Sequence, residues 1–141
     1  MNKLILLLVL TFFSITSPVL ASDQFITVVN PVRISPYNND HLASLRAQYG
    51  VISQYRLPAT WLLTYDVLNR PEIVTELKRF SPNQEIGIFL EITSEFSKVA
   101  GVGYHSTGSW HFANSVFLSG YTQEERIKFI DKVFSKFKER F

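Results

Sequence analysis

The chain of 141 residues contains no cysteine. This absence excludes a disulfide framework and any metal site with cysteine ligands. It also excludes the lipid anchor of bacterial lipoproteins, which is attached to a cysteine after the leader. The fold must therefore be held together by burial of apolar side chains.

The sequence also lacks an excess of charge of either sign. It has 14 basic and 12 acidic residues, and removal of an N-terminal leader that includes Lys3 leaves 13 basic residues and a balance of +1. A nucleic acid or an acidic membrane surface is therefore not an expected partner.

Long apolar runs are also scarce. The one at the N-terminus covers residues 4–15, whereas a membrane-spanning helix needs roughly 20 residues. The short basic start and the small residues before position 22 predict a signal peptide over residues 1–21, cleaved after Ala21. A membrane anchor is the rival interpretation. We expect a secreted or periplasmic protein with no stable membrane anchor after cleavage.

The rest of the chain, residues 22–141, is long enough for one domain and alternates between strand and helix patterns. We expect the first strand to stop at Asn30 and Pro31. The predicted strands are Phe25–Val29, Ala59–Tyr65 and Glu85–Ile92. The predicted helices start at Asp40, at Pro71, near Ser94 and at a capping box of Thr122 with Glu125.

The last helix repeats apolar residues three and four apart, which predicts its buried face. These residues are Ile127, Ile130, Phe134, Phe137 and Phe141. We consider a cluster of Phe129, Phe134 and Phe137 to be either core or the seat of a missing partner.

Strands that alternate with helices predict an α/β fold with a parallel sheet and right-handed crossovers. Three such units leave two exposed sheet edges, and Phe141 ends the last helix without a glycine cap. We therefore expect the N-terminal part of a larger, truncated (β/α) barrel, with a missing C-terminal part or self-association covering the open sheet. The alternative is a small layered domain completed by dimerisation.

The segment Leu57–Thr64, with the letters LPATWLLT, resembles the second strand of polysaccharide deacetylases of the NodB-homology type. Glu85-Ile86-Gly87 is similar to the family's HEIG strand, and Tyr121 to Phe137 is similar to its lSpeEi helix. The resemblance covers most of the chain after the leader. It implies a deacetylase-type barrel and a carbohydrate ligand.

The metal-site motifs of that family are absent. The resemblance implies two aspartates after the first strand, but Asn30-Pro31 stands there, and no acid occurs between Asn30 and Asp40. The family's His-x-x-x-His pair after the third strand is also missing. A deacetylase metal site needs several N or O ligands around one ion to activate water. We therefore predict no metal ligands and no evident cofactor.

Two carboxylates follow predicted strands. They would lie at the carboxyl ends of the strands, where (β/α) barrels place their active sites. Glu91, at the end of the third predicted strand, must be paired or neutralised if it is buried. It is a candidate catalytic group, or else it forms a salt bridge with Arg33. Asp66, after the second predicted strand, is a candidate general base or substrate ligand, or else a turn residue.

Four further residues are candidate substrate-binding groups: Asn30, Arg33, Trp110 and His111. Asn30 and Arg33 could instead order the loop around Pro31, and Trp110 could either stack on a sugar ring or fix its own loop. His105 and His111 lie six residues apart in a glycine-rich loop, so we expect two separate histidines rather than a metal pair.

Two hypotheses about function follow. The first is a hydrolase, similar to a carbohydrate deacetylase or glycosidase, that acts on an envelope or extracellular glycan through Glu91 and Asp66. The second is a catalytically inactive glycan-binding relative or an inactive fragment, which is favoured if the carboxylates are locked to Arg33.

Overall fold

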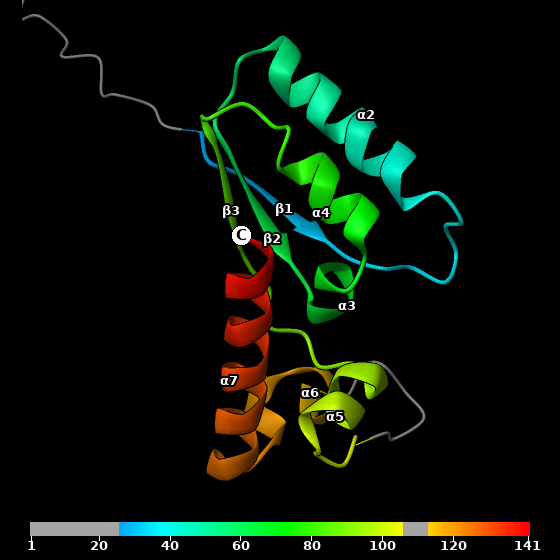
Figure 1. Ribbon diagram of the computed structural model, residues 1–141, viewed down its shortest axis with the longest axis vertical. Helices are drawn as coiled ribbons and strands as arrows, with labels where there is room; N and C mark the ends of the chain where they lie inside the picture. Colours follow the sequence, from blue (N-terminus) through cyan, green and yellow to red (C-terminus); the bar gives the residue numbers. More distant parts are fainter. Residues whose placement is uncertain (1–25, 106–112) are drawn as a thin grey trace, which may run out of the picture.

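The computed structural model describes residues 26–105 and 113–141 (Figure 1). Within these residues, three strands form one parallel sheet in the order β1-β2-β3, and helices connect them. The strands are β1 (Val28–Val32), β2 (Ala59–Leu63) and β3 (Gln84–Ile88). The predicted α/β class and parallel sheet are confirmed. The expected signal peptide lies outside the described residues.

The prediction that β1 ends at Asn30 and Pro31 was wrong, because both residues lie inside the strand. Thr64 N donates to Val32 O, so in the alternating parallel ladder the nitrogen of Pro31 points away from β2. β1 has no neighbour on that side among the described residues. A proline is tolerated at such an edge because no ladder hydrogen bond is lost there.

β2 and β3 are both shorter than predicted. β2 stops at Leu63, because the chain then turns into α3 (Tyr65–Leu68). The last bond between these two strands runs from Phe89 N to Leu63 O, so the residues after Phe89 have no ladder partner. Ile92 N instead donates to Val116 O. The segment that carries Glu91 is therefore a connection and not the end of a strand.

Most of the helices begin where the sequence predicts. Asp40 caps α2 (His41–Gln54), Pro71 is the first residue of α4 (Pro71–Leu77), and Thr93 caps α5 (Ser94–Ala100). The chain continues through α6 (Ala113–Val116) and the 3-10 turn η1 (Leu118–Gly120) to α7 (Gln123–Arg140). The capping box of Thr122 and Glu125 is present at the start of α7.

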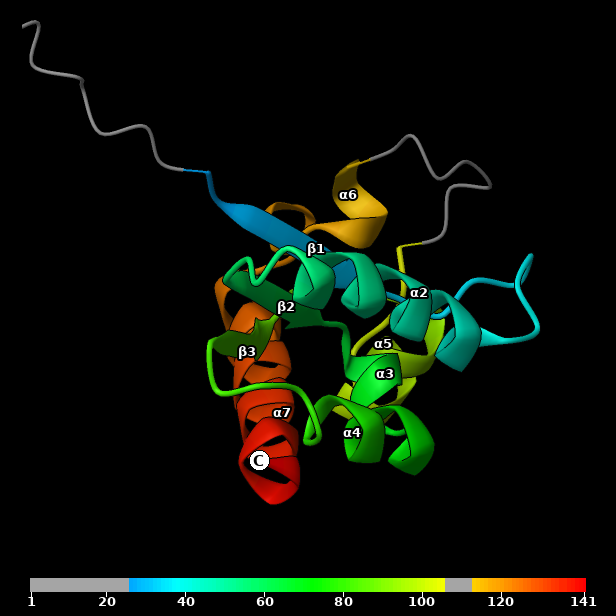
Figure 2. The ribbon, with the colours of Figure 1, turned by 90° about the horizontal axis from the view of Figure 1, so that it is seen from above.

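The helices α2 and α4 pack against one face of the sheet and against each other. On this face Trp61 is fully buried and meets the edges of the rings of Tyr49 and Phe80, which stack on each other. On the opposite face Val29 is about half exposed, and Leu62 is only partly covered. Figures 1 and 2 show α2 and α4 together on the same side of the sheet and the long helix α7 next to β3.

The predicted buried face of α7 was wrong. The fully buried residues are Phe129 and Val133, which pack toward α3 and α5, and only Phe137 of the predicted set packs against the core. The four others are exposed by more than a third: Ile127, Ile130, Phe134 and Phe141. The helix carries two adjacent apolar stripes, and the one that contains Phe129 and Val133 is buried in the core. No helix in the described ranges is long and apolar enough to span a membrane.

Candidate functional site

An ion pair joins the ends of the two outer strands. Arg33 directly follows β1, and Glu91 lies three residues beyond β3. The guanidinium donates from Nε to Oε2 of Glu91 at 2.7 Å and from Nη2 to Oε1. The Glu91 side chain is only 14% exposed, while that of Arg33 is 57% exposed. The salt bridge that the sequence left as one reading of Glu91 is therefore present.

This pair crosses the carboxyl end of β2. Because β2 lies between the outer strands, Arg33 and Glu91 meet across a distance of roughly two strand spacings, about 10 Å. Thr64, the residue after β2, is buried, and its hydroxyl has no hydrogen-bond partner among the described residues. The ion pair therefore closes the end of the sheet at which parallel α/β folds bind their ligands.

Asp66 lies in the first turn of α3, close to the ion pair. Its Oδ1 accepts a hydrogen bond from the Thr93 hydroxyl at 3.1 Å, and the same hydroxyl accepts from Phe96 N to cap α5. Burial raises the pKa of Asp66, the bond from Thr93 opposes this rise, and the nearby charges of Glu95 and Glu91 add to it. Asp66 therefore ties α3 to α5 and also has the raised pKa of a candidate acid.

Asn30 does not follow a strand, as the sequence suggested, but sits in the middle of β1 opposite Trp61. Alternation along the strand turns it toward the helix-covered face, together with Val28 and Val32, which pack against the core. Its Nδ2 is buried and has no hydrogen-bond partner in the described part of the chain. This position separates Asn30 from Arg33, which points to the open carboxyl end.

An aromatic cluster that the sequence analysis did not single out adjoins Glu91. Burial raises the pKa of Tyr104, and the nearby Tyr121 and Glu91 raise it further. The exposed ring of His105 stacks on the buried ring of Tyr121 at 4.3 Å, and the Tyr121 hydroxyl donates to Ser115 O at 2.8 Å. The sequence could have indicated this cluster, because Tyr104 and His105 stand before the glycine-rich loop and Tyr121 stands after it.

Two candidate binding residues, Trp110 and His111, lie outside the described residues. His105 and Tyr104 are placed beside the Glu91 segment, so the first part of that loop does reach the carboxyl end of the sheet. Among residues 26–105 and 113–141, no three His, Asp or Glu side chains are grouped to hold a metal ion.

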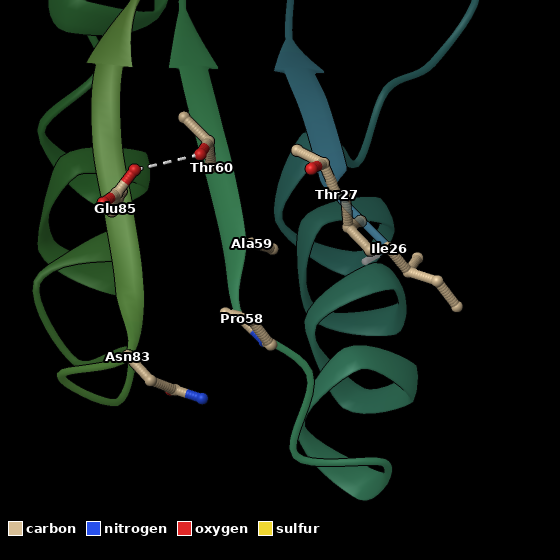
Figure 3. A pocket seen from close by; sticks show the side chains of 8 residues that line it. Ile26, Thr27, Pro58, Ala59, Thr60, Asn83 and Glu85 are labelled. Carbon is tan, nitrogen blue, oxygen red and sulfur yellow. Dashed lines mark hydrogen bonds between the residues drawn. The ribbon is translucent and has the colours of Figure 1, made fainter. Parts of the chain in front are cut away.

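A separate hollow of about 200 Å³ opens at the amino ends of the strands (Figure 3). The side chains of Ile26 and Thr27 from the β1 side, and of Pro58 and Asn83 from the starts of the other strands, surround it. Thr60 Oγ1 donates to Glu85 Oε2 at 3.2 Å above it. Open parallel α/β sheets bind their ligands at the carboxyl ends of the strands, so we do not place the functional site here.

No protein-family model, no curated protein and no solved structure matches the chain. The site must therefore be interpreted from its own chemistry. Its carboxylates are already engaged, Glu91 by Arg33 and Asp66 by Thr93. The Arg33 side chain remains more than half exposed. The exposed ring of His105 belongs to the aromatic cluster whose Tyr104 lies near Glu91. Such an arrangement can donate hydrogen bonds and offer a flat ring face to a polar ligand.

Proposed function

We propose that the chain is a carbohydrate-binding protein of the polysaccharide-deacetylase type that binds its ligand at the carboxyl ends of the strands without hydrolysing it. The observation that carries the proposal is the ion pair of Arg33 and Glu91. Both carboxylate oxygens of Glu91 accept bonds from the Arg33 guanidinium, so neither oxygen is free to contact a ligand while the pair is closed.

The barrel is part of this proposal. The strands follow one another in the order of the chain, and α2 and α4 cover one face, as in the outer ring of a βα barrel. The other face is only partly covered, and it carries the apolar side chains of Val29 and Leu62. These features support a partial barrel whose interior is the face that carries Val29.

The proposed ligand is a glycan of the cell envelope or the extracellular space, bound after export. A sugar ring presents hydroxyl groups to polar side chains and an apolar face to aromatic ones. Arg33 supplies charged donors, and the stack of His105 on Tyr121 supplies a ring that is held in place from behind. Trp110 and His111 are proposed to complete the contact surface. The proposal needs no cofactor.

Binding and turnover can be separated in one experiment on the full chain. The chain is incubated with insoluble chitin, cellulose and peptidoglycan, and both the bound fraction and the release of acetate or reducing ends are measured. We expect binding to at least one of these polymers and no release. Arg33→Met should abolish binding.

The chain provides a second ion pair that serves as a control for this substitution. Arg46 forms a similar two-bond pair with Glu76, at 2.8 and 2.9 Å, on the helical side of the molecule. The exposures of the two side chains, 56% and 15%, are almost those of the first pair. Arg46→Met should leave glycan binding unchanged. Equal loss in both variants would show that the effect comes from stability, and retained binding in Arg33→Met would refute the proposed site.

A hydrolase is the second candidate, and the raised pKa of Asp66 favours it. A half-buried acid that keeps its proton at a higher pH is suited to protonate a leaving group. Release of acetate or reducing ends by the parent chain, together with loss of release in Asp66→Asn, would establish this candidate in place of the first.

A further inference from the structure

A polar hollow lies beside Arg33, where the chain passes from β1 to α2, and its volume is about 80 Å³. Apolar residues form part of its wall, and the polar residues that line it are Arg33, Ser35, Asn38, His41, Ser44 and Gln48. None of the described residues that line the hollow is acidic. The hollow therefore shares Arg33 with the ion pair, but it does not share the carboxylate of Glu91.

The oxygen atoms of the hollow already accept hydrogen bonds from the protein. Ser35 Oγ accepts from Tyr37 N at 3.2 Å. Ser44 Oγ accepts from Asn38 Nδ2 at 2.7 Å, and Asn38 Oδ1 accepts from Asp40 N at 3.0 Å. A hydroxyl group that has accepted one bond still has its proton to donate. Both serines can therefore donate a hydrogen bond to a ligand in the hollow.

Arg33 and His41 add further donors. A guanidinium has five N–H groups, and the pair with Glu91 uses one on Nε and one on Nη2, so three remain. Because Glu91 holds the guanidinium by two bonds, these remaining donors keep a fixed orientation. The ring of His41 has one N–H when it is neutral and two when it is protonated. The hollow is therefore rich in donors, and a ligand that only accepts hydrogen bonds matches it.

The loop between β1 and α2 is held in place by its own hydrogen bonds. Asn38 N donates to Ser35 O at 3.3 Å, and Asp40 Oδ1 accepts from Ala43 N at 2.8 Å to cap α2. Asp40 is the acid closest to the hollow in the sequence, but this cap engages its side chain and it does not line the hollow. The donors of the hollow are therefore positioned before a ligand arrives.

The size of the hollow limits what it can hold. Pockets for whole small ligands have roughly 300–1,000 Å³, so about 80 Å³ accommodates one substituent of a larger molecule. We propose that the hollow binds an oxyanion substituent, a carboxylate or a sulfate, and that the ligand of this chain is an acidic glycan. This inference rests on the proposed function, because the sugar ring that carries the substituent would lie beside Arg33 at the carboxyl ends of the strands.

Two pairs of soluble polymers test the charge and its source. Polygalacturonate and its methyl ester share one backbone and differ in the charge of the carboxyl group, and dextran sulfate and dextran differ in the sulfate. Binding of the full chain to each polymer is measured by titration calorimetry. We expect the charged member of at least one pair to bind tighter by roughly tenfold or more. This preference should shrink between about 0.1 and 1 M salt, because the screening length falls from about 10 Å to about 3 Å.

The charge of the hollow can be changed at one exposed position of α2. Gln48 lines the hollow, so Gln48→Glu places a carboxylate beside the bound oxyanion. Repulsion of like charges should weaken binding of the acidic polymer by roughly tenfold, and Gln48→Lys should strengthen it. Binding of the uncharged polymer should stay the same in both variants. Gln54→Glu and Gln54→Lys, at an exposed position of the same helix that does not line the hollow, are the matched controls and should change neither affinity.

Two results would overturn this inference alone. One is equal affinity for the charged and the uncharged member of both pairs, with binding to chitin or cellulose retained, because the chain would then bind glycans without an oxyanion. The other is a preference for the charged polymer that Gln48→Glu and Gln54→Glu weaken equally or not at all, because the oxyanion would then bind outside the hollow. A chain that binds none of the polymers would instead refute the proposed function together with this inference.

Discussion

Arg33 and Glu91 should contribute unequally to stability, although they share the same two hydrogen bonds. Arg33→Met leaves a carboxylate that is only 14% exposed without its cation. An unsatisfied buried polar group costs about 1–3 kcal/mol, and a charged group costs more. Glu91→Gln leaves a guanidinium that is 57% exposed, and water can solvate it. The Gln oxygen still accepts one bond, so the cost should stay below about 1 kcal/mol.

The assay is urea unfolding followed by tryptophan fluorescence, since Trp61 is fully buried and reports on the core. The double variant Arg33→Met with Glu91→Leu should recover part of the lost stability, because it removes the buried carboxylate as well as its cation. A cost for Glu91→Gln that equals or exceeds the cost for Arg33→Met would refute the reasoning. It would mean that the charge of Glu91 stabilises the fold through contacts other than the pair.

The second ion pair gives a contrasting case for the same measurement. Glu76 has another cation close by, because Arg79 Nη1 lies 3.6 Å from its Oε2. Arg46→Met therefore leaves Glu76 partly paired, whereas the described residues offer Glu91 no cation besides Arg33. We expect Arg46→Met to cost less than Arg33→Met despite the similar exposures.

Two further predictions concern the site and the open face of the sheet. Burial raises the pKa of Asp66, so its contribution to stability is full below the ordinary value of 3.8 and falls as the pH rises through the raised pKa. Unfolding measured against pH should show Asp66→Asn gaining stability relative to the parent as the pH rises to neutrality, and a constant difference would contradict this. In Gly87→Ala, the added Cβ would come within 2.9 Å of Leu62 Cδ2. On an open face Leu62 can move aside, so the cost should stay below about 1 kcal/mol, while a larger loss in urea unfolding would show that the face is covered.

The sequence was most informative where a local signal has a local cause. The Asp40 cap, Pro71 at a helix start and the box of Thr122 with Glu125 were all confirmed, because each depends on backbone groups within one turn. The strand ends were less predictable. Pro31 could be read as a strand end only if β1 had neighbours on both sides, and the sheet order is not a local property.

The buried face of α7 shows a second limit of prediction from sequence. The helix has apolar residues on two adjacent sides, and periodicity alone favours the longer stripe from Ile127 to Phe141. The core instead takes Phe129 and Val133, because these positions meet Phe96 of α5 and the neighbouring α3. Only the tertiary arrangement distinguishes the side that packs inward from the side that remains available.

The site itself could be predicted only as a set of residues, and its meaning comes from how they are paired. The sequence indicated that Glu91 and Arg33 would lie at the carboxyl edge, but it left open whether the carboxylate is free for chemistry. The structure shows it held by two bonds in a position that water reaches poorly. A group in this state can shape a binding surface, and it can act as a base only after Arg33 has moved away. A ligand that displaces Arg33 is therefore the one condition under which the hydrolase hypothesis could involve Glu91, and retained turnover in Arg33→Met would be its signature.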